Sequence, residues 1–146
     1  MAQISSVLGP LDTADLGFTL SHEHVQVTSA GIQQVYPEFI DRQATITTGV
    51  AQLREAYAEG LRTIVDVTTI DLGRDIKLIE QVSRESGVQI VCATGTWLDI
   101  PRVFWTATPD PKQMIRVFSN CSMCGSSVRA EAISARKVKV EPPLVE

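Results

Sequence analysis

Residues 18–25 read FTLSHEHV, an apolar, strand-like segment that ends in two histidines. Side chains on a strand alternate between its faces, so His22 and His24 should point to one side and Glu23 to the other. Two imidazoles one residue apart on one face can both reach a single divalent metal such as zinc. The chain has only two histidines, and both lie here. The alternative is a chance pair on an exposed strand that binds nothing.

The apolar residues before the histidines favour the metal interpretation. A near-continuous apolar run predicts a strand buried on both faces, as in parallel α/β sheets. Histidines at the end of such a strand would lie at its carboxyl end, where α/β proteins place their functional sites.

Length and composition indicate a folded protein without a nucleic-acid or membrane partner. A chain of 146 residues is long enough to form one domain with a core. The net charge of −4 argues against nucleic acid or an anionic membrane as a partner. No secretory signal or bilayer-spanning run is visible, and three cysteines cannot all pair within the chain. We therefore expect a reducing, cytoplasmic location.

The order of expected elements predicts parallel strands joined by right-handed crossovers. A short strand over residues 3–8 and a turn at Gly9-Pro10 predict an N-terminal hairpin before the histidine strand. Residues 28–41 then form a long loop, which hints at a function near the site. After it come a helix over 42–59, a strand over 61–68, a helix over 75–86, a strand over 88–93 and a short helix over 111–118.

Individual residues set the ends and buried faces of the two long helices. Asp41 and Asp75 are expected to cap their starts, and Gly60 and Gly87 to follow their ends. Asp71 could share the capping, or Asp66 or Asp71 could orient a metal-bound histidine. The spacing predicts two inward stripes: Ile46, Val50, Leu53 and Tyr57 on the first helix, and Ile76, Ile79 and Val82 on the second.

Three stretches together resemble the bacterial phosphotriesterase family of the amidohydrolase superfamily, which includes organophosphate hydrolases and phosphotriesterase-like lactonases. They are GFTLSHEH (17–24), RTIVDVTTIDLGRD (62–75) and IVCATGTWLD (90–99). The resemblance covers about residues 9–118. It implies a (β/α)₈ barrel of the TIM type, with two metals at the carboxyl ends of its strands. In such enzymes a hydroxide that bridges the metals attacks a phosphoryl or carbonyl centre.

The resemblance also implies roles for individual residues. His22 and His24 match the His-x-His that holds the more buried metal, most often zinc. Trp97 matches an aromatic wall of the substrate pocket, although it could instead be a loop residue that covers the barrel rim. The substrate would be a small ester, lactone or organophosphate.

The sequence departs from the family in its later part. The family's site needs a carboxylated lysine, two further histidines and an aspartate from later strands, and this chain has no third histidine. A whole barrel takes about 250 residues, so we expect a partial barrel of about three βα units. A frameshift, an alternative transcript or a fusion junction would each explain the change.

We therefore expect residues 1–118 to form the N-terminal part of the barrel. Residues 119–146 would form a divergent tail, weakly structured or disordered, because the charge balance changes there from acidic to basic. The chain alone should be inactive. The alternative is a non-catalytic, truncated product that binds at most one metal or forms a homo-oligomer through open strand edges.

The three cysteines offer weaker metal chemistry. Cys121 and Cys124 form a Cys-x-x-Cys that could complete a zinc set with the histidines, but the usual order and spacing of ligands are absent. Cys92 is expected to be a small buried hydrophobe in its strand.

Overall fold

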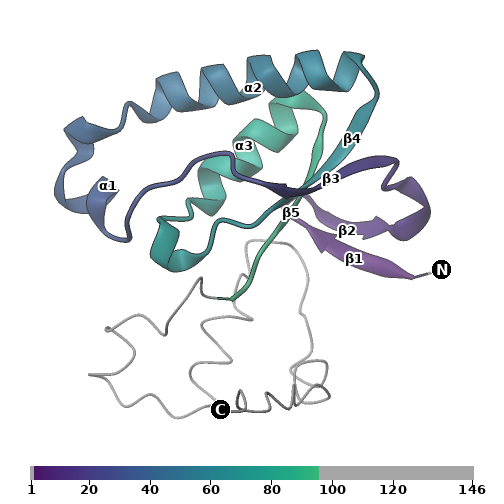
Figure 1. The fold of residues 1–146 in the computed structure, drawn as a ribbon, viewed down its shortest axis with the longest axis horizontal. Helices are drawn as coiled ribbons and strands as arrows, with labels where there is room; N and C mark the ends of the chain where they lie inside the picture. Colours follow the sequence, from purple (N-terminus) through teal and green to yellow (C-terminus); the bar gives the residue numbers. More distant parts are fainter. Residues whose placement is uncertain (1, 96–146) are drawn as a thin grey trace, which may run out of the picture.

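A computed structural model describes residues 2–95 of the chain. An antiparallel hairpin comes first, followed by a three-stranded parallel sheet in which helices connect consecutive strands (Figure 1). The strands are β1 (Gln3–Ser6), β2 (Gly9–Asp12), β3 (Phe18–Glu23), β4 (Leu61–Asp66) and β5 (Gln89–Cys92). The helices are α1 (Ile32–Val35), α2 (Arg42–Ala58) and α3 (Ile76–Ser86), with 3₁₀ turns η1 (Thr13–Asp15), η2 (Pro37–Phe39) and η3 (Ile70–Leu72).

The sheet order β3-β4-β5 follows the sequence, as the strand–helix alternation predicted. The register aligns the carboxyl ends of the strands, because Asp66 of β4 lies opposite both Glu23 of β3 and Cys92 of β5. Helices α2 and α3 pack on each other and on the strands, and both lie on the same side of them in Figure 1. Loops that follow β3, β4 and β5 therefore meet at one edge of the sheet.

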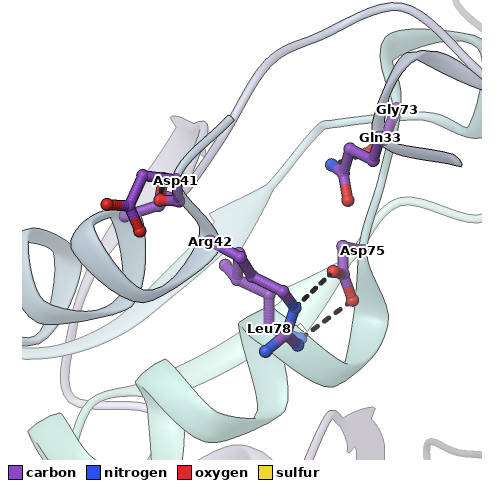
Figure 2. A network of polar contacts seen from close by, with 7 residues as sticks. Gln33, Asp41, Arg42, Gly73, Asp75 and Leu78 are labelled. Carbon is purple, nitrogen blue, oxygen red and sulfur yellow. Dashed lines mark hydrogen bonds and ion pairs between the residues drawn. The ribbon is translucent and has the colours of Figure 1, made fainter. Parts of the chain in front are cut away.

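The predicted helix caps are confirmed. The Asp41 carboxylate accepts a hydrogen bond from the Ala44 amide at 2.9 Å, and Asp75 accepts one from Leu78 at 3.0 Å. Gly87 ends α3 with a left-handed φ of 82°. An ion pair of 3.1 Å between Arg42 and Asp75 joins the starts of the two helices, as Figure 2 shows. Between residues 2 and 95, no helix is long and apolar enough to cross a bilayer.

The expected turn and the expected inward stripes needed correction. Gly9 and Pro10 begin β2, and the turn of the hairpin lies two residues earlier than expected, at residues 7–8. Tyr57 is 40% exposed, while its neighbour Ala56 packs against the core. The Tyr57 ring instead lies 4.1 Å from the guanidinium carbon of Arg62, a cation–π contact at the surface. Leu78, which the second stripe omitted, is completely buried.

Strand β3 is not buried on both faces, which corrects the expectation from its apolar run. Phe18 is 66% exposed and Leu20 is 36% exposed. Within the described residues β3 pairs only with β4, so it forms an edge of the sheet. The apolar run is therefore a surface that another element could cover. The buried core lies instead between β4, β5 and the two helices, and contains Ile46, Val50, Leu61, Ile64, Leu78, Ile79, Val82, Val88 and Ile90.

The substitution Gly73→Ala tests how closely the loop after β4 packs on the loop after β3. Gly73 has a φ of +73°, and a Cβ added to it would overlap the Thr28 hydroxyl oxygen. Gly31 has a similar φ of +85° but no atom within 4 Å of such a Cβ, so Gly31→Ala is a matched control. Both substitutions carry left-handed strain. We expect Gly73→Ala to lower the free energy of unfolding by about 1–3 kcal/mol more than Gly31→Ala. Equal urea midpoints for the two variants would contradict the packing described here.

Candidate metal centre

The two histidines lie together at the carboxyl edge of the sheet. His22 is near the end of β3 and His24 is one residue past it. Their ring centroids are 5.6 Å apart at an interplanar angle of 75°. Both rings line a cavity of about 500 Å³, whose other walls are Val27, Val67, Thr69, Leu72, Ala93 and Gly95. The two imidazoles thus share one cavity, as strand alternation predicted.

Glu23 lies between the two histidines but does not line the cavity that they share. It is half-buried and lines a second cavity together with His24 and with Gly49 and Leu53 of α2. Its backbone carbonyl accepts a hydrogen bond of 2.9 Å from the Val67 amide. Glu23 thus lies beside the helix layer, and a structural role for it stays a prediction.

The carboxylate of Asp66 holds the loops after β3 and β4 together. Asp66 is completely buried. One of its oxygens accepts from the Val25 amide at 3.0 Å, and the other accepts from the Thr68 amide at 2.8 Å. The Asp66 carbonyl also accepts from the Ala93 amide at 2.8 Å, which fixes the chain after β5. One residue therefore links the three chain segments around the histidine cavity.

Thr68 is the residue that contacts a histidine ring. Its hydroxyl oxygen is 2.9 Å from Nδ1 of His24 and 3.3 Å from the carbonyl oxygen of Gln26. The sequence interpretation had considered Asp66 or Asp71 for this role. Asp71 lies in η3, where its carboxylate accepts a hydrogen bond from the Thr69 hydroxyl. Thr68 was missed from the sequence alone, because its partner His24 is 44 residues away and no local pattern marks the contact.

The site within the described residues offers two ligands for a metal. No group of three or more His, Cys, Asp and Glu side chains among residues 2–95 could hold a metal ion. Two accessible imidazoles in one cavity fit part of a zinc coordination sphere, which usually takes three or four protein ligands. Cys92 is half-buried rather than buried. Trp97, Cys121 and Cys124 lie outside the described residues.

Comparison with known proteins decides the family. The sequence model of the phosphotriesterase family matches residues 2–126. The chain belongs to the phosphotriesterase family. The match extends past residue 118, where the resemblance was expected to end, and the domain boundary there stays a prediction.

Relatives in the phosphotriesterase family match over part of their length. A phosphotriesterase homology protein of Mycobacterium tuberculosis is 44% identical over 107 residues, which are 71% of this chain and 33% of that protein. The aryldialkylphosphatase of Saccharolobus solfataricus is 34% identical over 102 residues, 68% of this chain and 32% of its own. The chain thus spans about a third of the length of these relatives.

A solved structure supports the predicted fold. The phosphotriesterase from Mycobacterium tuberculosis superimposes with a TM-score of 0.64 at 43% identity, over 70% of this chain and 33% of that one. The described residues therefore form consecutive βα units of a phosphotriesterase-type fold. The three strands among them do not close a barrel.

Asp66→Asn tests whether the buried carboxylate holds the site's loops. Asparagine has one acceptor oxygen, so one of the two backbone N–H groups would face an amide N–H instead. We expect the free energy of unfolding to fall by about 2–3 kcal/mol. Asp41→Asn is the matched control, because asparagine caps a helix as well as aspartate does. A urea midpoint for Asp66→Asn as high as that of the control would show that the Asp66 carboxylate does not hold these loops.

Proposed function

We propose that this chain supplies the His-x-His pair of a metal-dependent hydrolase that acts on phosphotriesters, lactones or carboxylic esters. The single observation that supports the proposal is the pair of imidazoles on one cavity at the carboxyl edge of the sheet. Imidazole nitrogen is a preferred ligand of zinc, so zinc is the metal we propose. Such a metal, when bound, supplies Lewis-acid activation of water and of the ester oxygen.

The cavity's other residues fit an ester substrate. Val27, Val67 and Leu72 give it apolar walls, which suit the alkyl or aryl groups of an ester. Gly95 lines the cavity and precedes Trp97 by two residues, so we propose that Trp97 extends this apolar wall. The relative named aryldialkylphosphatase supports an organophosphate substrate for the complete enzyme.

A second, non-catalytic function is favoured by the small number of ligands. The described residues supply two histidines and no larger ligand cluster, and the sequence has no third histidine. On this alternative the chain holds at most one metal and has negligible turnover. Its exposed β3 edge, with Phe18 and Leu20, would then bind a second copy of the chain.

Zinc binding tests the ligand assignment. We expect the full chain to bind zinc, and His22→Ala and His24→Ala each to weaken binding by at least about 10-fold, because each removes a ligand. A Cys121→Ser, Cys124→Ser double variant should bind zinc like the unmodified chain, since those thiols are not ligands in this proposal. Competition with a chromophoric chelator gives the affinities. Unchanged zinc affinity in both histidine variants would refute the assignment.

Hydrolysis assays on the same preparations test the expectation that the chain alone is inactive. We expect zinc binding without turnover of an aryl phosphotriester or a lactone, because the described residues supply no larger ligand cluster than the two histidines. Turnover that depends on both histidines would overturn this expectation and exclude the non-catalytic alternative.

Self-association can be tested at the exposed edge strand. We expect sedimentation velocity to show concentration-dependent association of the chain, and Phe18→Lys to shift it toward monomer, because a charge on the edge disfavours pairing. Phe39 is 73% exposed and lies on η2, not on β3, so Phe39→Lys is the control. A monomer at all concentrations would contradict association through β3.

A further inference from the structure

We propose that Thr68 is a positioning residue that fixes the tautomer of His24. It holds the His24 ring with its proton on Nδ1, which leaves the lone pair of Nε2 available to a metal. The part of the inference that concerns metal binding rests on the proposed function. The part that concerns the tautomer stands on the geometry of the metal-free chain alone.

The hydroxyl of Thr68 has a single proton and two neighbours. One neighbour, the Gln26 carbonyl oxygen at 3.3 Å, can only accept a hydrogen bond. The other, Nδ1 of His24 at 2.9 Å, can donate or accept. Both contacts become hydrogen bonds only if the threonine proton goes to the carbonyl and Nδ1 donates to the hydroxyl oxygen. In the reverse arrangement, oxygen lone pairs of Thr68 and Gln26 face each other without a proton between them.

The position of this hydroxyl is set by buried structure and not by the ring. Thr68 is completely buried, and its amide donates to the buried Asp66 carboxylate at 2.8 Å. The other oxygen of that carboxylate binds the amide of Val25, the residue after His24. Both the hydroxyl and the backbone that carries the ring are therefore fixed to one carboxylate. The hydrogen bond to Nδ1 is thus built before any metal arrives.

The consequence for a metal follows from the two nitrogens of the ring. The hydrogen bond made by one ring nitrogen decides which nitrogen is free to bind a metal. With Nδ1 occupied by Thr68, His24 would use Nε2. Within residues 2–95, the His22 ring makes no hydrogen bond. Its tautomer therefore serves as an internal reference for the tautomer of His24.

Nitrogen-15 NMR of the full, metal-free chain tests the tautomer. Spectra are taken at an alkaline pH at which imidazoles are neutral, and His22→Ala assigns the two rings, since the chain has no others. We expect His24 to carry its proton on Nδ1, and Thr68→Ser, which keeps a hydroxyl, to preserve this state. Thr68→Val, which keeps the shape and the backbone amide, should lose it. Thr63→Val is the matched control, because Thr63 of β4 is also a completely buried threonine, but its hydroxyl donates to the Leu16 carbonyl oxygen and it does not line the histidine cavity.

Zinc titration of the same four chains adds the functional readout. Loss of an outer partner of a metal ligand typically weakens metal binding by about 10–100-fold, and we expect this for Thr68→Val. Thr68→Ser and Thr63→Val should stay within a few-fold of the unmodified chain.

The two readouts fail separately. If His24 has the expected tautomer but the chain does not bind zinc, the positioning inference holds and the proposed metal site is wrong. An Nε2–H tautomer in the unmodified chain, or no change of tautomer in a folded Thr68→Val, overturns the inference. If Thr68→Val does not fold, the tautomers of the unmodified chain and of Thr68→Ser decide the question.

Discussion

The carboxylate of Asp66 is the group on which the arrangement of this site depends. A charge buried without partners is strongly unfavourable, so Asp66 can be completely buried only because its oxygens accept hydrogen bonds. Its two backbone partners, Val25 and Thr68, follow two neighbouring strands and are 43 residues apart in the sequence. Hydrogen bonds to a charged group contribute about 1.5–3 kcal/mol each, which is enough to hold segments that would otherwise separate beyond the strand ends. The loops after β3 and β4 therefore stay in place because the buried Asp66 carboxylate needs the hydrogen bonds from Val25 and Thr68.

The organisation of the histidines therefore comes from two adjacent strands and not from a complete barrel. His22 and His24 are placed by β3, and the contact that fixes the His24 ring comes from the residue two positions past the end of β4. The parallel pairing of β3 with β4 is enough to bring these groups together. Relatives of the phosphotriesterase family are about three times as long as the matched region. Their remaining length can supply other ligands and cover the site without being needed to position these two rings.

Features with local causes were predictable from the sequence. Asp41 and Asp75 cap helices through bonds to residues three positions away, and the shared face of His22 and His24 follows from strand alternation. The parallel order of the strands followed from their alternation with helices. The resemblance of three motifs to one family then gave the fold type, which the superposition supports.

Features that depend on distant partners were not predictable in the same way. Tyr57 fits the helical stripe, yet its ring lies at the surface against Arg62, and Ala56 packs against the core. The apolar run of β3 predicted burial, but burial depends on what lies beside the strand, and within the described residues β4 is its one partner in the sheet. The Thr68–His24 contact joins residues 44 apart, so no local pattern indicates it.

Different parts of the structure would orient the two histidine rings and exclude water from them. His22 and His24 are exposed, although Asp66 and Thr68, which hold the chain and the ring beside them, are completely buried. A metal in an open, hydrated site gains less electrostatic effect on a substrate than one in an enclosed site, because water screens its charge. The described residues thus account for where an imidazole points and which nitrogen it presents. Phe18 and Leu20 leave apolar surface exposed on the same strand, so a segment packed on β3 would cover apolar surface as well as exclude water.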